Sequence, residues 1–303
     1  MRRAMTLTAL VLAGVVSLAA AARMQEQAPK VLQVTKLKDN LFVLKGGGGN
    51  TAVFIMSDGV TVVDTKNPGW GQPILDKIKE LTNKPVVRII NTHTHADHVS
   101  GNVAFPATVD IVTQENTKIN MQEMRTPTGI TTPAANVFKD SGGRGMPKRT
   151  FKERMTIGKG PDEIELYYFG RGHTNGDAWV FFPALRVLHA ADMFSGKNLP
   201  LLDANNGGSG VAIPDSLQKA YDTVKNADVI ITGHSTEMTR DDLKEYIAFN
   251  REFLNDMRAA KKAGMSVDDE ASTWKMPAKY AGYMIGPEGR LKANVQVIYD
   301  ELK

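Results

Sequence analysis

Residues 93–98, which read HTHADH, hold the densest group of potential metal ligands in the chain. They directly follow an apolar run at residues 86–90, which we expect to be a buried strand. Backbone that leaves a strand is irregular, so several neighbouring side chains can turn toward one point. Imidazole and carboxylate groups bind borderline divalent metals where no thiolate is available. His93 and His95 can therefore share one metal, while Asp97 and His98 face a second.

Five of the six histidines occupy positions that suit metal ligands, which a scattered structural set would not do. His173 lies in an expected turn between two strands and suits a third ligand for the first metal; the alternative is a surface turn histidine. His234 follows its own strand and a glycine and suits the second metal; the alternative is a helix-capping or buried histidine. The sixth, His189, lies within an apolar strand, and we interpret it as a core residue or a support for the ligands.

Two aspartates follow strands in the same manner. Asp192 comes after the apolar run at residues 185–189, where a carboxylate can reach both metals and offset the repulsion between two nearby cations. Asp64 follows the run at residues 60–63 and can orient a ligand histidine through its outer N–H. The alternatives are a turn or helix-capping role for Asp192 and a plain turn aspartate for Asp64.

Composition limits the remaining chemistry. The 303 residues include no cysteine, which excludes disulfides, Cys-ligated zinc, iron–sulfur clusters and a thiol nucleophile, so any metal must be held by nitrogen and oxygen. A formal charge of +4, with 42% hydrophobic and 23% charged residues, is typical of a folded, soluble globular protein.

The first 22 residues have the outline of a secretory signal peptide. Arg2 and Arg3 precede an uncharged apolar run, and alanines at residues 19–22 offer a cleavage site. A retained membrane anchor is the alternative, because the run approaches the length of a bilayer span. We expect an exported protein, periplasmic or secreted. Cleavage removes two arginines and no acid and lowers the formal charge from +4 to +2, which gives nucleic-acid binding little electrostatic support.

Apolar patterning predicts alternating strands and helices. Strands are expected at residues 31–37, 41–44, 51–56, 60–63, 86–90, 163–169, 178–182, 185–189 and 229–231. Helices are expected around residues 74–81, 215–225 and after Thr239. The segment 124–150, rich in Thr, Pro and Gly, is expected to be a long loop. In two places a helix precedes a strand that ends in histidine, at His93 and His234, which predicts a duplicated α/β sandwich with a site at a shared edge.

These residues together resemble the metallo-β-lactamase superfamily. Asp64 matches its first motif, residues 93–98 match its HxHxDH signature, and His173, Asp192 and His234 match the later three, in order. The resemblance covers about residues 41–235. It implies an αββα sandwich with a dinuclear metal site, usually zinc, at the sheet edge. It assigns His93, His95 and His173 to one metal, and Asp97, His98 and His234 to the other, with Asp192 as the bridge.

The sequence differs from β-lactamases that use a cysteine ligand, because Asp192 stands at that position. A bridging aspartate is more like glyoxalase II and the metallo-lactonases. The export signal argues against a cytoplasmic glutathione thioesterase. Residues 172–177 and 189–194 look like segments of the exported metallo-hydrolase branch. We therefore expect a signal peptide at residues 1–22 and one domain at residues 23–303, with residues 266–303 as a C-terminal helical extension.

The expected activity is hydrolysis of a small acyl compound such as a lactone, β-lactam, ester or thioester. Two divalent ions, with Zn²⁺ as the expected metal, lower the pKa of a shared water toward about 7, and the resulting hydroxide attacks a carbonyl. Asp97 orients this hydroxide and relays a proton. The alternatives are a metal-dependent nuclease, a single-iron dioxygenase and a non-catalytic metal-binding protein. No nucleic-acid partner is expected, and a membrane partner only if the N-terminal segment is retained.

Two features are candidates for substrate contacts. The glycines at residues 46–49 predict a mobile loop near the site, with a plain hairpin as the alternative. Lys197 is a candidate for binding a substrate carboxylate, with a solvated surface lysine as the alternative. Neither the substrate nor the oligomeric state follows from the sequence.

Overall fold

A computed structural model describes residues 30–302, so the expected signal peptide lies outside the described residues. Residues 32–302 belong to one compact unit. Among the helices of the described part, none combines the length and apolar character needed to cross a membrane. The prediction of one domain at residues 23–303 stays a prediction.

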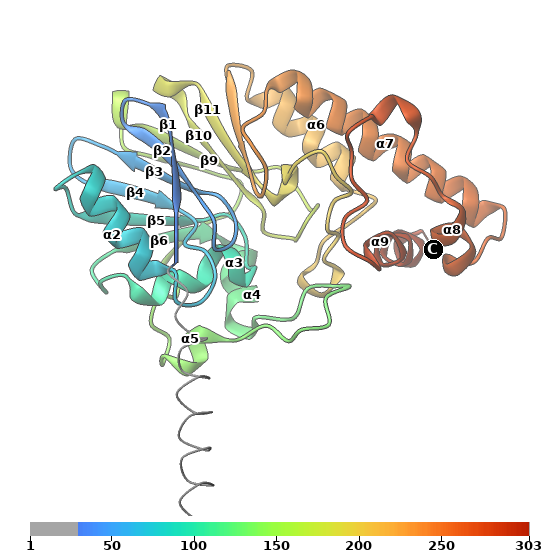
Figure 1. Ribbon diagram of the computed structural model, residues 1–303, viewed down its shortest axis with the longest axis horizontal. Coiled ribbons are helices and arrows are strands. Elements are labelled where there is room, and N and C mark those ends of the chain that lie inside the picture. Colours follow the sequence, from blue (N-terminus) through green and yellow to red (C-terminus); the bar gives the residue numbers. More distant parts are fainter. Residues whose placement is uncertain (1–29, 303) are drawn as a thin grey trace, which may run out of the picture. The chain divides into compact units, whose positions relative to one another are not determined.

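Two β-sheets lie at the centre of this unit (Figure 1). The first contains β1 (Gln33–Lys38), β2 (Leu41–Lys45), β3 (Thr51–Ile55), β4 (Val60–Val63), β5 (Val86–Asn91), β6 (Asp110–Gln114) and β7 (Arg149–Phe151), in that order. The second contains β8 (Arg154–Ile157), β9 (Ile164–Tyr168), β10 (Ala178–Phe182), β11 (Val187–Ala191) and β12 (Val229–Thr232), in the reverse order. Strands β1 to β4 pair antiparallel and β4 to β7 parallel; in the second sheet only β11 and β12 pair parallel.

Helices cover the outer face of each sheet. The first half of the chain supplies α2 (Gly71–Leu81), α3 (Ala96–Val99), α4 (Glu115–Glu123) and α5 (Val137–Asp140). The second half supplies α6 (Ile213–Thr223), α7 (Arg240–Lys262), α8 (Val267–Thr273) and α9 (Arg290–Glu301). Figure 1 shows α2 beside the first sheet and α6 and α7 beside the second. Residues 266–303 contain α8 and α9, separated by a segment with a short 3₁₀ helix.

Successive side chains of a strand point to opposite faces of its sheet, and this alternation places apolar residues on both sides of each sheet. In β3, Phe54 packs in the core between the sheets, whereas Val53 packs under α2. In β10, Val180 faces the first sheet and Trp179 packs in the core beneath α6, α7 and α9. Each fully buried side chain of this kind contributes about 1.5–3 kcal/mol to folding. With one apolar core between the sheets and one outside each, the predicted αββα fold is confirmed.

The helices form where local signals agree with burial. In α2, Ile74 and Ile78 lie one turn apart and both face the first sheet. Helix α7 begins with a capping box in which Thr239 and Asp242 exchange side-chain and backbone hydrogen bonds. Its apolar face, which includes Leu243, is buried against the second sheet and its neighbouring helices.

Some elements differ from the sequence expectations. No strand was expected at β6, because only two aliphatic residues, Ile111 and Val112, lie between Asp110 and Thr113. Parallel pairing with β5 on one side and with β7 on the other nevertheless stabilises it. The expected loop at residues 124–150 contains the one-turn helix α5 and the start of the edge strand β7.

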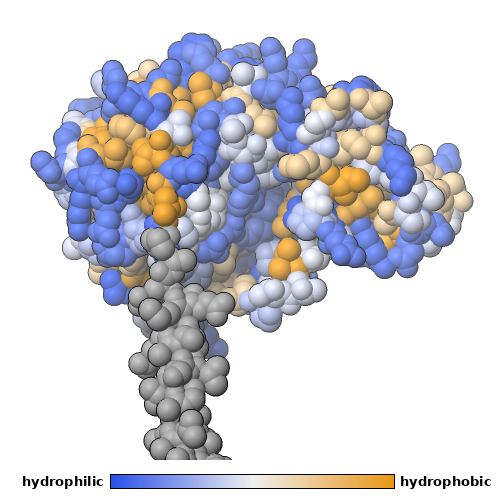
Figure 2. All heavy atoms as spheres, in the orientation of Figure 1, coloured by the Kyte–Doolittle hydropathy of each residue, from blue (hydrophilic) through white to orange (hydrophobic). Residues whose placement is uncertain are grey.

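Figure 2, in the orientation of Figure 1, shows hydrophilic residues over most of the visible face.

Candidate metal centre

The expected ligands come from the ends of strands in both sheets. Residues 93–98 turn away from the end of β5 into the short helix α3, whose N-cap is His95. His173 lies in the connection between β9 and β10. Asp192 directly follows β11, and His234 lies two residues beyond the end of β12. Because these strand ends meet at one edge, the structure brings all seven expected ligands together.

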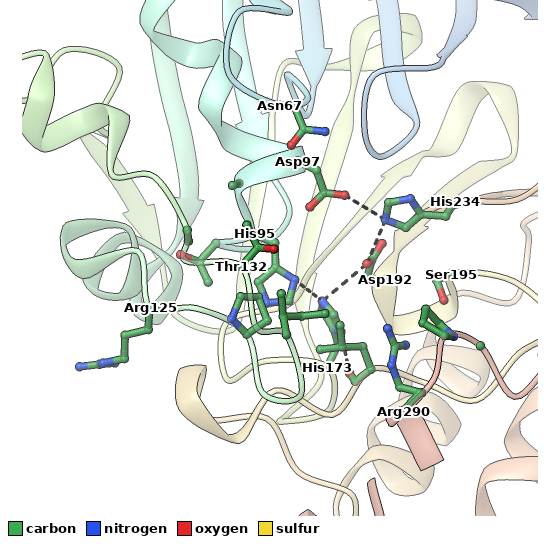
Figure 3. A pocket seen from close by; sticks show the side chains of 18 of the residues that line it. Asn67, His95, Asp97, Arg125, Thr132, His173, Asp192, Ser195, His234 and Arg290 are labelled. Carbon is green, nitrogen blue, oxygen red and sulfur yellow. Dashed lines mark hydrogen bonds and ion pairs between the residues drawn. The ribbon is translucent and has the colours of Figure 1, made fainter. Parts of the chain in front are cut away.

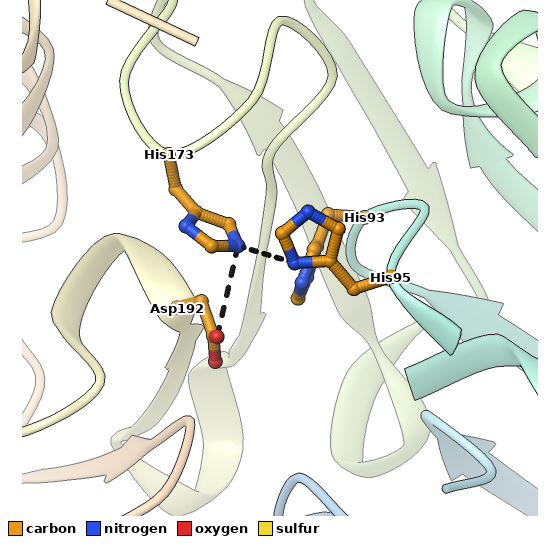
Figure 4. Close-up of side chains that lie close together, drawn as sticks. All are labelled: His93, His95, His173 and Asp192. Atoms are coloured by element: carbon orange, nitrogen blue, oxygen red, sulfur yellow. Dashed lines mark hydrogen bonds and ion pairs between the residues drawn. The ribbon is translucent and has the colours of Figure 1, made fainter. Parts of the chain in front are cut away.

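One group contains His93, His95, His173 and Asp192, whose ligand atoms all lie within 4.8 Å of one another (Figure 4). His173 Nε2 lies 2.9 Å from His95 Nδ1 and 3.6 Å from Asp192 Oδ2. Neighbouring ligand atoms around a tetrahedral cation, each about 2.0–2.1 Å from it, lie about 3.3 Å apart. The spacing of this group therefore suits a metal ion.

A second group contains Asp97, His98 and His234, also within 4.8 Å of one another. His234 Nε2 lies 3.3 Å from both His98 Nε2 and Asp97 Oδ2. Asp192 stands between the two groups: Oδ1 lies 3.3 Å from His98 Nε2, and Oδ2 lies 3.2 Å from His234 Nε2. One carboxylate is thus within reach of both groups.

The outer nitrogens of the buried histidines have hydrogen-bond partners, which leaves the inner ones for a metal. The contacts are His93 Nδ1 to Thr92 Oγ1 at 3.0 Å, His95 Nε2 to Asp203 Oδ2 at 2.7 Å, His98 Nδ1 to Asp64 Oδ2 at 2.7 Å, and His173 Nδ1 to the Leu201 carbonyl at 2.8 Å. His93 Nε2 is buried and has no hydrogen-bond partner among the described residues. A buried, unpaired nitrogen that points into a group of other ligand atoms fits a metal cation.

Charge distribution differs between the groups. Burial, reinforced by His95, lowers the pKa of His173 to about 3, and burial with the neighbouring histidines holds the pKa of His93 well below its usual range. Burial also lowers the pKa of His98. The negative charges of Asp192, Asp97 and Asp64 outweigh this effect and raise the pKa well above its usual range. Asp192 also raises the pKa of His234. His93 and His173 in the first group are therefore neutral imidazoles suited to coordination, whereas the second group stabilises positive charge.

Asp64 contacts the second group through the ring of His98. It lies just beyond β4 with φ 62°, a left-handed conformation that aspartate tolerates better than most residues. Its buried carboxylate accepts hydrogen bonds from the Thr92 N–H at 2.8 Å, the Thr92 hydroxyl at 2.7 Å and His98 Nδ1 at 2.7 Å. The two bonds from Thr92 hold the Asp64 carboxylate in place, and its bond to Nδ1 then fixes the orientation of the His98 ring.

The glycine run at residues 46–49 lies against the back of the site, and none of its residues lines the cavity described below. A Cβ on Gly48 would lie 2.6 Å from the Asp97 carbonyl oxygen, and one on Gly49 would lie 2.2 Å from His98 Cε1. The Gly49 N–H donates to the Asp97 carbonyl at 3.0 Å. Glycine is needed here because the backbone lies so close to the ligands. The loop was considered from the sequence as a substrate contact, but its residues pack behind the ligands.

A cavity of about 670 Å³ opens onto both groups (Figure 3). His95, Asp97, Asp192 and His234 form part of its polar lining. Apolar and small side chains from residues 124–135 and 284–287 form other parts of its wall, so the segment expected to be a long loop lies at the cavity. This arrangement places an apolar space next to a cluster of ligands, as in small-molecule sites.

Several other residues can be placed. Lys197, a sequence candidate for substrate binding, does not line the cavity, and its ammonium pairs with Asp242 at 3.0 Å and Glu245 at 3.4 Å. His189 is buried, with its ring nitrogens 3.2 Å from the Asn50 carbonyl and the Ala191 N–H, as a core histidine would be.

Sequence reasoning missed three residues near the site. Asp203 holds His95, Lys66 lies buried behind the glycine run, and Arg290 lines the cavity. No local motif marks any of them: Asp203 and Arg290 reach the site from distant parts of the chain, and Lys66, two residues after Asp64, belongs to no ligand motif.

Comparison with known proteins agrees with this geometry. The model of the metallo-beta-lactamase superfamily matches residues 44–234. The chain belongs to this superfamily. A metallo-beta-lactamase type 2 from Elizabethkingia meningoseptica is 25% identical over 256 residues, covering 78% of this chain and 90% of that protein. A hydroxyacylglutathione hydrolase from Crocosphaera subtropica is 27% identical over 173 residues, covering 56% of this chain and 54% of that protein.

Solved structures share the fold. A metallo-beta-lactamase from Pontibacter korlensis has a TM-score of 0.61 at 21% identity, covering 73% of this chain and 99% of that chain. A sec-alkylsulfatase from Pseudomonas has a TM-score of 0.70 at 16% identity, covering 89% of this chain and 50% of that one. The protein is thus a hydrolase-like member of the superfamily with a candidate metal-binding cluster of His and Asp residues.

Proposed function

We propose that the protein is a dinuclear metal-dependent hydrolase that attacks the carbonyl of an acyl substrate such as a lactone, β-lactam, ester or thioester. The observation that supports this most is the position of Asp192 between two groups of ligands. One divalent ion, Zn²⁺ in our proposal, would be held by His93, His95 and His173. The other would be held by Asp97, His98 and His234, and Asp192 would contribute to both. The names of the relatives, a metallo-beta-lactamase and a hydroxyacylglutathione hydrolase, favour an acyl substrate.

The chemistry follows from the donor set and the cavity. Two divalent ions bound in such a site would make water more acidic and would polarise a carbonyl oxygen. Asp97, whose side chain is 29% exposed at the cavity, orients the attacking water and passes its proton to the leaving group. Asp64 and Asp203 keep the His98 and His95 rings in position.

Metal content and turnover test this proposal together. Protein loaded with zinc and freed of excess metal should contain two zinc ions per chain by elemental analysis. It should hydrolyse at least one class in a panel of lactones, β-lactams, thioesters and simple esters. One iron per chain in protein purified from its native source would favour a single-iron dioxygenase instead, and two metals without turnover of any class would contradict the hydrolase proposal.

Replacement of Asp97 tests where the chemistry takes place. Asp97→Ala should lower kcat/KM by about 10²- to 10⁴-fold, because the variant loses both a ligand and a proton relay. Asp300→Ala on the exposed side of α9 should leave kcat/KM unchanged. Unchanged circular dichroism would show that the variants fold. Full turnover by Asp97→Ala would place the reaction elsewhere.

We also propose that residues 1–22 direct export and are removed, which leaves residues 23–303 as one domain. The basic, apolar and alanine-rich order of this segment supports the proposal. N-terminal sequencing of the protein from the periplasmic or secreted fraction should begin at Arg23. An intact Met1 on protein from the membrane fraction would instead show a retained anchor.

A further inference from the structure

A guanidinium group that the proposed reaction does not use faces the metal centre. Arg290 is the first residue of α9 and lines the cavity. Figure 3 shows its side chain pointing toward His173 and Asp192, whereas Arg125, on another wall, points away from them. Arg290 therefore brings the C-terminal helix into the site.

Within residues 30–302, the Arg290 guanidinium has no hydrogen bond and no carboxylate within ion-pair distance. The other cations near the cavity are neutralised: Arg125 pairs with Glu123 at 2.5 Å, and Lys197 pairs with Asp242 at 3.0 Å. Arg290 is half-buried, and burial lowers its pKa, although Asp192 and Tyr246 counteract this. A partly desolvated, unpaired cation is unfavourable by itself, so it is best explained by an anion that binds there.

The neighbouring wall restricts what carries that anion. Ile130 and Met284 line the cavity and are 40% and 63% exposed, and both are among the few large apolar side chains exposed in the described part of the chain. Leu199 and Met124 extend the apolar surface inward. A ligand that satisfies both features has an apolar body and an anionic end.

We propose that Arg290 binds an oxyanion of the substrate, a carboxylate or sulfonate, and so selects anionic acyl compounds. This inference rests on the proposed hydrolase function. Arginine offers a planar fork of N–H donors that pairs with two oxygens of one anion. With the anion on α9 and the scissile carbonyl between Asp97 and Asp192, the substrate lies across the cavity from the C-terminal helix to the metal centre.

Matched esters test the selectivity. Zinc-loaded protein is assayed with the mono-p-nitrophenyl ester of glutarate, its methyl ester, and an analogue of the same length ending in sulfonate. Wild type should prefer at least one charged ester over the neutral one by about 10- to 100-fold in kcat/KM, as expected for a charge-assisted hydrogen-bonded pair. Arg290→Gln should lower the ratio of kcat/KM for the charged ester to kcat/KM for the neutral ester to about one. Arg290→Lys should keep part of the preference, because lysine retains the charge without the fork.

Lys197→Gln is the matched control, since it removes a nearby cation that is already paired and lies outside the cavity lining. It should keep the full preference. Equal kcat/KM for charged and neutral esters in wild type, or an undiminished preference in Arg290→Gln, would overturn the inference. The carboxylate and sulfonate arms show which oxyanion is preferred.

Binding provides a readout that does not depend on turnover. Calorimetry on metal-free and zinc-loaded protein compares 4-phenylbutanoate with 4-phenylbutanamide. For each protein we take the ratio of the Kd of the amide to the Kd of the acid. This ratio should be about tenfold larger for wild type than for Arg290→Gln. The same acid–amide ratio in both proteins would refute the role of Arg290. If the esters are not hydrolysed but this ratio depends on Arg290, the hydrolase proposal fails while the anion site stands.

Discussion

Asp203 orients His95 from behind, although it lies 108 residues further along the chain. The carboxylate is buried and also accepts hydrogen bonds from the Thr128 N–H at 2.9 Å and from Asn206 Nδ2 at 2.6 Å. Burial acts to raise the pKa of Asp203, but the hydrogen bond and charge of His95 prevail and lower it to about 2. An ionised carboxylate therefore faces His95 Nε2 and keeps Nδ1 directed at the first ligand group.

Asp203→Asn should weaken zinc binding to the first group by about 10- to 100-fold, because the amide supports the ring less strongly than a carboxylate. Competition with a chromophoric chelator measures this affinity. Asp222→Asn, an exposed aspartate on α6 that accepts only from Gln218, is the control and should leave the affinity unchanged. Equal zinc affinities for Asp203→Asn and wild type would show that His95 needs no such support.

Lys66 predicts a pH dependence of stability. Its side chain is fully buried and donates to the carbonyls of Leu44 at 2.8 Å and Gly49 at 2.7 Å. Burial lowers its pKa from 10.5 to about 7, against the opposing charges of Asp64 and Asp97. Between these two values the unfolded chain binds a proton that the folded chain has released. The free energy of unfolding therefore rises with pH in this window, by up to about 1.4 kcal/mol per unit.

Urea unfolding of metal-free wild type and Lys66→Met at pH 7 and pH 9.5 isolates this contribution. The difference in unfolding free energy, wild type minus variant, should increase by about 3 kcal/mol from the lower to the higher pH. For the exposed Lys219→Met the same difference should not depend on pH. A difference for Lys66→Met that stays constant would mean that the buried amine keeps its proton throughout.

At the scale of elements, the turn between β2 and β3 sets the distance between the backbone and the second ligand group. Gly49→Ala should displace the His98 ring, because the new Cβ would lie 2.2 Å from His98 Cε1. We expect this variant to bind one zinc ion per chain in place of two, as measured by elemental analysis after dialysis. Gly264→Ala, at φ 79° with open space around its Cβ, should cost about 1 kcal/mol of stability and keep both ions. Two tightly bound ions in Gly49→Ala would contradict this account.

The elements differ in how far the sequence predicts them. Strand β10 agrees with the expected residues 178–182, because a long run of large apolar side chains fits a strand buried on both faces. Strands β6, β7 and β8 were not expected, since each has few aliphatic residues and depends on pairing with a neighbour. Tertiary pairing, which a local pattern does not contain, determines these three.

The candidate site divides in the same way. Rare residue types at strand ends, as in residues 93–98, indicate a site before any contact is known, and the structure brings them together with His173, Asp192 and His234. Arg290 and Asp203 carry no such signal, because an arginine at a helix start or an aspartate in an irregular segment is common. Their roles follow only from contacts between distant segments.

The whole molecule is built so that both sheets contribute side chains to one candidate metal centre. Residues 93–98 follow a strand of the first sheet, whereas Asp192 and His234 follow strands of the second. In the unfolded chain these groups are far apart, so a metal that binds all of them binds the folded state preferentially. Such binding stabilises the fold by RT ln(1 + [L]/Kd), which is about 2.7 kcal/mol at a metal concentration of 100 Kd.

Metal removal should therefore lower the melting temperature. Treatment with EDTA should reduce Tm by about 5 to 10 °C, and added zinc should restore it. Asp192→Asn should show a smaller zinc-dependent shift, because an amide is a weaker bridge between two cations. Scanning calorimetry on the same preparations provides the comparison. A Tm that is identical with EDTA and with zinc would mean that the two halves hold together without a shared ion, and the strand ends would then meet for packing alone.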